Sequence, residues 1–335
     1  MKISSMSAGL VVAVIAAVSF GTSGGLIKPL LEAGWSPTAA VTVRVLVGGL
    51  VLLPIALLSL RGRWSALWRA RWRVTVMAVV GVAATQVFYF AAIQTIPVAT
   101  ALLIELLAPL LLVGYTWAAT RRIPRPLVLI GSVFAVGGLV FVIGPGAIQA
   151  VDPLGLMFAF LAMIGCAIYF VIAARPSDGL PPVAFAASGL VLGGVTLGLL
   201  GITGLLPFTA TFGNLPLAGA ELPWWVPFLI VAIVSTAIAY VAGITAAEAL
   251  GSRLASFVAL LEVVFAALFA WQLLGEQLMP LQLLGGVLIL GGIAAVRAAG
   301  STDEEPAVKA RLPEVSVVVD GILNLKTSVG RVPER

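Results

Sequence analysis

The chain has 335 residues, of which 61% are hydrophobic and only 10% are charged, and its mean hydropathy is +1.15. This composition excludes a soluble domain of ordinary make-up and indicates a protein that crosses a membrane several times. The net charge of +5 is accompanied by no histidine and one cysteine, so the commonest metal ligand is missing and no disulfide can form within the chain. We therefore expect neither a metal nor another cofactor.

Ten apolar stretches are long enough to cross the membrane. A helix needs about 20 apolar residues to span roughly 30 Å of hydrocarbon. The apolar pattern at the start continues past Phe20 to Ile27, so we expect a first helix and not a cleaved signal peptide. We predict an all-α polytopic protein with transmembrane helices near residues 7–27, 37–60, 74–93, 98–118, 126–143, 154–174, 182–205, 224–247, 253–274 and 280–298.

The basic residues between these helices indicate the orientation. If both termini are cytoplasmic, only Lys28 falls in an external loop. This is the positive-inside bias of membrane proteins, so the basic charge reports topology and not a nucleic-acid partner. We predict a multi-pass protein of the plasma or inner membrane, in contact with bilayer lipid. The cytoplasmic set is Lys2, Arg61, Arg63, Arg69, Arg71, Arg73, Arg121, Arg122, Arg125, Arg175, Arg253 and Arg297.

The sequence contains an internal repeat. A shift of 154 residues, the difference between 260 and 106, aligns the segment from Leu106 with the segment from Leu260 without a gap. The stretch "GGLVLL" at 48–53 has a weaker counterpart in "GGVTLG" at 193–198. Identical pairs are Leu106 with Leu260, Trp117 with Trp271, Pro126 with Pro280, Gly131 with Gly285, and Gly137 and Gly138 with Gly291 and Gly292.

Each repeat contains five predicted helices, and an odd number requires the second repeat to cross the membrane in the opposite sense. The charge of the loop between the last two helices of each repeat changes accordingly. The first repeat has Arg121 and Arg122 there, and the second has Gly275 and Glu276. We predict two inverted repeats, at residues 7–143 and 154–298. The polar remainder, 299–335, is predicted to be a disordered cytoplasmic tail.

Two segments resemble EamA-type transporters of the drug/metabolite transporter superfamily. They are "SFGTSGGLIKPLLEAGWSPTAAVTVRVLVGGLVLLP" and "SRLASFVALLEVVFAALFAWQLLGEQLMPLQLLGGVLILGGI". The matching positions are Gly21 to Gly25, Lys28, Ser36, Pro37 and Arg44 in the first, and Glu262, Gly275, Glu276, Gly285 and Gly291 in the second.

The resemblance extends over residues 7–298 and implies ten helices around a central cavity. It also implies export or exchange of small metabolites, amino acids being a frequent class. The chain departs from the family at its Glu-Pro pairs. Helix nine has Glu262 followed by Val263, and helix four keeps Pro109 but has Ala108 before it and Glu105 one turn earlier.

Charged residues inside the predicted helices are candidate functional residues. A charge in hydrocarbon costs at least about 2.5 kcal/mol, so such residues normally face the interior of the bundle. Arg44 and Glu105 lie at similar depth, and we expect them to be neighbours. They either bind a zwitterion, with Arg44 meeting its carboxylate and Glu105 its amine or a proton, or form a structural ion pair. Both interpretations stay open on the sequence alone.

Other polar and aromatic residues could line the same cavity. Glu262, near the midplane, is a candidate proton carrier, although a glutamic acid hydrogen-bonded between helices fits the position equally well. Gln86 and Tyr89 recur at helical spacing, and aromatic walls are expected from Tyr169, Tyr240 and Trp271. Helix packing is the alternative role for each aromatic residue.

These observations favour a secondary transporter, most simply an exporter of small metabolites such as amino acids, with proton coupling as one hypothesis. A facilitator or importer is the first alternative. A lipid-modifying enzyme is the second, but no histidine and no nucleophile with an adjacent base are evident. A membrane scaffold is the third. We expect a monomer or a homodimer.

Overall fold

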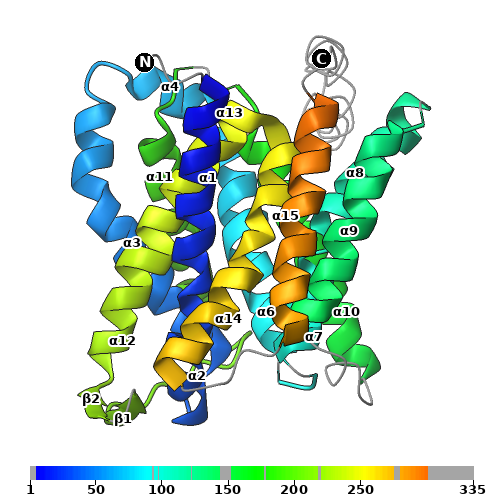
Figure 1. Ribbon diagram of the computed structural model, residues 1–335. Helices are drawn as coiled ribbons and strands as arrows, with labels where there is room; N and C mark the ends of the chain where they lie inside the picture. The colour runs from blue at the N-terminus through cyan, green and yellow to red at the C-terminus, as the bar shows by residue number, and fades with distance from the viewer. Residues whose placement is uncertain are drawn as a thin grey trace, which may run out of the picture.

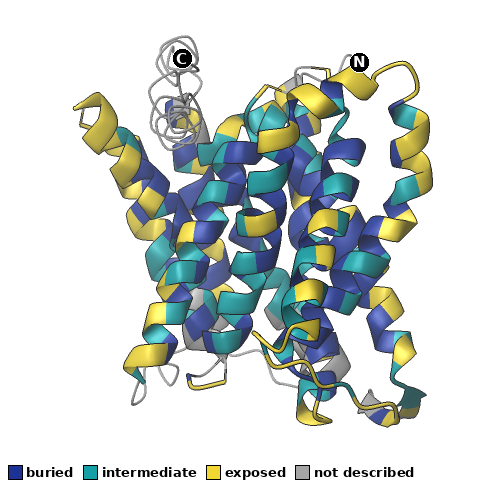
Figure 2. Cartoon of the chain, turned by 180° about the vertical axis from the view of Figure 1, so that it is seen from behind, coloured by how far each residue is buried: buried dark blue, intermediate teal, exposed yellow. Residues whose placement is uncertain are grey.

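The computed structural model describes residues 5–92, 94–96, 98–121, 123–143, 152–176, 179–217, 220–274 and 280–300. These residues form a bundle of long helices (Figure 1). Buried residues fill the middle of the bundle, and exposed ones lie on its outer faces and ends (Figure 2). Leu50, Ile55 and Leu58 are all more than half exposed, as suits a helix face in contact with lipid.

The first half of the chain contains ten helical elements. Ser36 caps one of them through its hydroxyl, which accepts from the backbone nitrogen of Ala39. The elements are α1 (Ser5–Gly21), α2 (Ser23–Glu32), α3 (Pro37–Ser59), α4 (Trp64–Arg69), α5 (Arg71–Val76), η1 (Met77–Ala84), α6 (Thr85–Ala92), α7 (Val98–Glu105), α8 (Ala108–Thr120) and α9 (Pro126–Ile143).

The second half has helices of similar length and order. A sharp turn at Gly251, which has φ 79° and ψ 162°, divides one of them and separates the predicted eighth and ninth segments. The elements are α10 (Pro153–Ala173), α11 (Pro182–Ile202), β1 (Asn214–Leu217), β2 (Ala220–Pro223), α12 (Trp225–Ile230), η3 (Val231–Ile238), α13 (Ala239–Ala259), α14 (Leu261–Leu274) and α15 (Pro280–Gly300).

Five stretches of helix are long and apolar enough to cross a membrane: Pro37–Ser59, Arg71–Ala92, Pro153–Ala173, Pro182–Ile202 and Trp225–Ala259. Three shorter apolar helices accompany them, at Met6–Gly21, Pro126–Phe141 and Leu283–Val296. The chain is therefore a multi-pass membrane protein. Some predicted spans are divided, because the first helix breaks at Thr22 and the fourth at Leu106 and Leu107.

The all-α prediction is wrong at one place, the antiparallel hairpin of β1 and β2. Its segment contains Gly, Pro and Thr, which favour turns and extended chain over helix. The loop before the hairpin is fixed to the turn between α2 and α3, since the indole nitrogen of Trp35 in that turn donates to the carbonyl of Thr211 at 2.6 Å. The Trp35 ring also packs against Phe228, with centroids 4.6 Å apart. The hairpin lies at the opposite end of the bundle from α4 (Figure 1).

Glycines allow α9 and α15 to pack closely. A Cβ added at Gly131 would lie 2.8 Å from the carbonyl oxygen of Gly292, and one added at Gly138 would lie 2.8 Å from the nitrogen of Ile289, beside Gly285. Gly131 thus faces Gly292, and Gly138 faces Gly285. The two helices are antiparallel, because the contact position falls along α15 as it rises along α9. Adding 154 to Gly131 and Gly138 gives Gly285 and Gly292, so a shift of 154 residues maps each of the two contacts onto the other.

A second pair of contacts joins matching elements, although its glycines, Gly48 and Gly193, are 145 and not 154 positions apart. A Cβ at Gly48 of α3 would lie 2.8 Å from the carbonyl of Ala232 in η3, and one at Gly193 of α11 would lie 2.9 Å from the carbonyl of Ala78 in η1. Segments η1 and η3 are both π-helical, eight residues long and 154 positions apart. π-helical turns often mark functional sites, and here both lie deep in the bundle.

Candidate functional site

The break between α1 and α2 gathers polar groups in the interior. The Thr22 hydroxyl donates to the carbonyl of Ser19 at 2.7 Å and lies 2.6 Å from the hydroxyl of Ser235 in η3. Gly21 packs against the backbone of α14, since an added Cβ would lie 3.0 Å from the carbonyl oxygen of Glu262. The missing side chain at Gly21 therefore lets the break in the first helix approach Glu262.

Arg44 reaches the same break from α3. Its side chain is buried, at 3% exposure, and one terminal nitrogen donates to the hydroxyl of Ser23 at 3.3 Å. Its Nε is buried and has no hydrogen-bond partner among the described residues. Within that part of the chain, no carboxylate lies within 4.0 Å of the guanidinium. A buried guanidinium without an anion is costly, so this position favours an anionic ligand.

Two glutamates lie in the same region. Arg44 interacts electrostatically with Glu105, the last residue of α7, and with Glu262, the second residue of α14. Both glutamate side chains are partly buried. The structure thus places Arg44, Glu105 and Glu262 in one electrostatic neighbourhood, yet no ion pair joins Arg44 to either glutamate among the residues described.

Tyrosines from three helices complete the cluster. Tyr89 of α6 and Tyr240 of α13 both interact electrostatically with Arg44. The Tyr240 ring packs edge-on against Tyr169 of α10, with centroids 5.8 Å apart. The Tyr169 hydroxyl is buried without a partner among the described residues and lies against Gly243. We name Arg44, Tyr89, Glu105, Tyr169, Tyr240 and Glu262 the central cluster.

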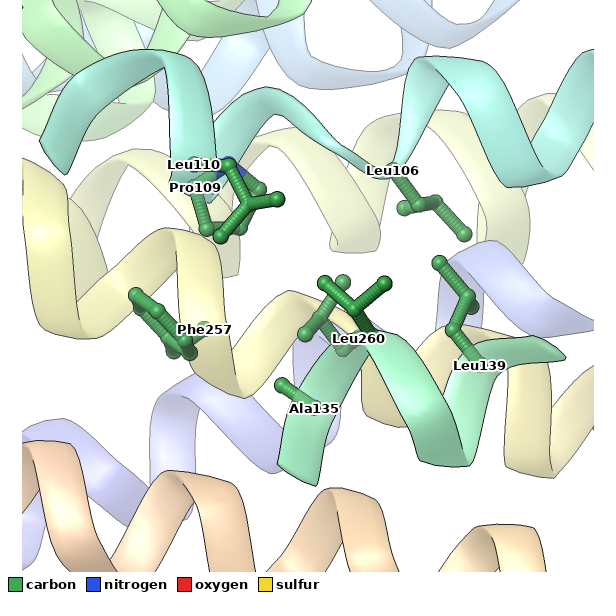
Figure 3. Close-up of a pocket in the computed structure, with 8 residues that line it drawn as sticks. Leu106, Pro109, Leu110, Ala135, Leu139, Phe257 and Leu260 are labelled. Atoms are coloured by element: carbon green, nitrogen blue, oxygen red, sulfur yellow. The ribbon is translucent and has the colours of Figure 1, made fainter. Parts of the chain in front are cut away.

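A small apolar crevice lies where helices four and nine are interrupted. Leu106 and Leu260, the pair matched by the 154-residue shift, both point into it (Figure 3). The sequence signal for it was the alignment of these two leucines beside Pro109. The pocket offers an apolar surface and no charge, in contrast to the central cluster. Its lining is Leu106, Pro109, Leu110, Ala135, Val136, Leu139, Phe257 and Leu260.

Comparison with known proteins identifies the family. The sequence profile of the EamA-like transporter family matches residues 7–144 and 153–298. The chain belongs to this family. The match covers two copies of the family's repeat, and the resemblance to the drug/metabolite transporter superfamily is confirmed. The protein is thus an EamA-like membrane transporter.

Solved structures agree with this EamA-like fold. One, titled "Crystal structure of protein", superposes with a TM-score of 0.71 at 21% sequence identity. The superposition covers 89% of this chain and 99% of that one. At this identity the likeness concerns the fold alone. No curated protein matches the chain.

The remaining predicted residues of the transporter are less completely defined. Gln86 is partly buried on α6, and its side chain forms no hydrogen bond to another described residue. Trp271 belongs to α14, but its side chain lies outside the described part, as do Gly275, Glu276 and the tail from 301 onward. No group of three or more potential metal ligands occurs among the described residues.

Proposed function

We propose that this EamA-like protein is a secondary transporter that exports small zwitterionic metabolites such as amino acids. The observation that carries the proposal is Arg44, which is 3% exposed and has no carboxylate within 4.0 Å among the described residues. A substrate carboxylate would satisfy the guanidinium through charge-assisted hydrogen bonds. Glu105 would then meet the substrate amine. The direction of export rests on the family resemblance.

The arrangement of the cluster supports alternating access. Its residues come from six elements, α3, α6, α7, α10, α13 and α14, so a substrate bound there would contact both repeats. Sites between repeats near the midplane are typical of secondary transporters, in which one repeat moves against the other. The tyrosines would supply the walls of the site.

We also propose ten membrane crossings arranged as two inverted repeats. The antiparallel glycine contacts between α9 and α15 support this, because a shift of 154 residues exchanges them. The start of α1 and the end of α15 lie at the same end of the bundle (Figure 1), as an even number of crossings requires. The basic loop at α4 lies at that end too, which favours cytoplasmic termini.

Proton coupling through Glu262 extends the proposal. Its carboxyl group lies near Arg44, and its backbone touches Gly21 at the break in the first helix. A carboxyl group in this position can be neutral when the site is empty and ionised when a cationic group is bound. Loss or gain of its proton would then accompany substrate movement.

Transport assays test this function. Purified protein in proteoliposomes is supplied with a panel of labelled amino acids and related metabolites, with and without an imposed pH gradient. We expect saturable flux of at least one zwitterionic compound, increased by the gradient. Flux without dependence on the gradient would make the protein a facilitator or exchanger. Absence of flux across the whole panel would contradict the proposed substrate class.

A further inference from the structure

Arg73, at the start of the third predicted span, makes contacts with three other helices. Its Nη2 lies 3.1 Å from a carboxylate oxygen of Glu248, which precedes the turn at Gly251 in α13. Its guanidinium also donates to the carbonyls of Ile172, Ala173 and Pro176, at 3.1, 3.3 and 2.8 Å. Its Cζ lies 4.4 Å from the centre of the Phe185 ring in α11.

These contacts stabilise the packing of the helices more strongly than a surface ion pair would. Arg73 is 9% exposed and Glu248 is 21% exposed at the side chain, so the pair is shielded from solvent more than a surface ion pair. The carbonyls of Ile172 and Ala173 belong to the last turn of α10, where the helix dipole is negative and a cation is favourable. The planar guanidinium can meet several oxygens together, which a lysine could not.

Three of the four joined helices also carry the tyrosines of the central cluster. Arg73 precedes η1 and α6, which hold Tyr89; α10 holds Tyr169; and α13 holds Tyr240. Any separation of these helices at the Arg73 end would therefore open a path toward the three tyrosines. The helices can separate at this end only if the contacts of Arg73 break.

The opposite end of the bundle is held differently. The positions related to Arg73 and Glu248 by the 154-residue shift are Pro227 and Gln94, which cannot form an ion pair. That end is closed by the packing of Trp35 against Phe228 instead. The two ends, equivalent in an inverted repeat, thus have contacts of different chemistry.

We propose that Arg73 and Glu248 form a latch that keeps the Arg73 end of the pathway closed. The proposal rests on the transport function proposed above, and the basic loop beside Arg73 assigns this end to the cytoplasm. Arg73 acts as a positioning residue, since it closes the path without touching the substrate. Breaking the latch shifts the population of the transporter toward the state open at this end.

The only cysteine of the chain provides the test. Cys166 is partly buried on α10, one turn before Tyr169, so it reports access to the central cluster. The full-length protein in inside-out membrane vesicles is treated with a membrane-impermeant methanethiosulfonate. We expect Glu248→Gln and Arg73→Gln to raise the rate of Cys166 modification by about tenfold, which corresponds to a shift of about 1.4 kcal/mol.

Controls separate the latch from general loosening. Arg71→Gln removes an exposed arginine whose side chain, among the described residues, contacts the carbonyl of Trp68 and the neighbouring tryptophan rings, and it should leave the rate unchanged. In right-side-out vesicles, the two latch variants should react no faster than the wild type. Cys166→Ser gives the background.

An unchanged rate in both latch variants, or an equal increase from both faces, would overturn the proposal. If Arg73→Gln fails to fold, Glu248→Gln decides alone, because it leaves the Arg73 contacts to α10 in place. The assay needs no substrate. A latch effect without any metabolite flux would therefore contradict the transport function only, and flux without a latch effect would contradict the latch only.

Discussion

The guanidinium of Arg44 donates to the hydroxyl of Ser23 at 3.3 Å, which joins the second predicted span to the break in the first. This contact holds the only cationic side chain of the central cluster next to the bend between α1 and α2. Movement of α2 about that break would therefore shift Arg44. A substrate that binds Arg44 as proposed would therefore couple its binding to the position of the first helix.

Neutralising Arg44 should weaken transport, and neutralising Glu105 as well should not restore it. Since no ion pair joins the two among the described residues, the double variant Arg44→Gln/Glu105→Gln gains nothing over Arg44→Gln. We expect the apparent affinity for the substrate to fall by about 10- to 100-fold in Arg44→Gln, as for loss of a charged hydrogen bond of about 1.5–3 kcal/mol. Flux measured against substrate concentration checks this, with the exposed Arg63→Gln as control. Rescue by the double variant would indicate a structural ion pair.

Glu262→Gln should separate proton coupling from substrate movement. The amide keeps the size of the side chain but cannot release a proton. We expect the stimulation of flux by a pH gradient to disappear, while exchange of labelled for unlabelled substrate continues. The two assays are run on the same proteoliposomes. Gradient-driven flux in Glu262→Gln equal to that of the wild type would reduce Glu262 to a structural role.

Adjacent glycines provide a matched test of the α9–α15 contact. An alanine at position 138 would bring its Cβ 2.8 Å from the nitrogen of Ile289, whereas at position 137 no atom lies within 4 Å of the added carbon. We expect Gly138→Ala to destabilise the protein by about 1–3 kcal/mol. Gly137→Ala should be neutral or slightly stabilising, because alanine favours helix. Thermal unfolding in detergent compares the two, and equal midpoints would contradict this packing.

Labelling of single cysteines should reveal the number of crossings. In a Cys166→Ser background, cysteine is introduced at Arg63, at Ile123 and at Gly213. Ten spans place two crossings between Arg63 and Ile123, so we expect both to react from the cytoplasmic side. Gly213 should react from the outside only. Reaction of Arg63→Cys and Ile123→Cys from opposite faces would show that helix four does not span the membrane.

Much of the fold follows from local sequence. Pro126 and Pro280 were predicted to begin matching helices, and α9 and α15 begin there, because proline at the first position leaves no backbone donor unpaired. Four of the glycines aligned by the shift, Gly131, Gly138, Gly285 and Gly292, proved to be close contacts between antiparallel helices. Family membership was also evident from the two long motifs.

Features that depend on distant contacts were not predictable. The π-helical segments lack a distinctive apolar pattern and show only in the backbone hydrogen bonding. Arg73 read as one basic residue among several in a cytoplasmic loop, because its partners lie about 100 to 175 positions away. The break at Leu106 was likewise hidden, since Pro109 alone is compatible with a continuous span.

The most direct test of the central claim is whether the substrate protects Cys166. The thiol belongs to α10 and lies one turn before Tyr169 of the central cluster, so a substrate bound in that cluster would restrict access to it. Modification by a thiol reagent is timed with and without a saturating amount of the amino acid that shows the highest flux. The account predicts several-fold slower modification in the wild type and no protection in Arg44→Gln. Equal rates with and without substrate in the wild type would place the binding site elsewhere.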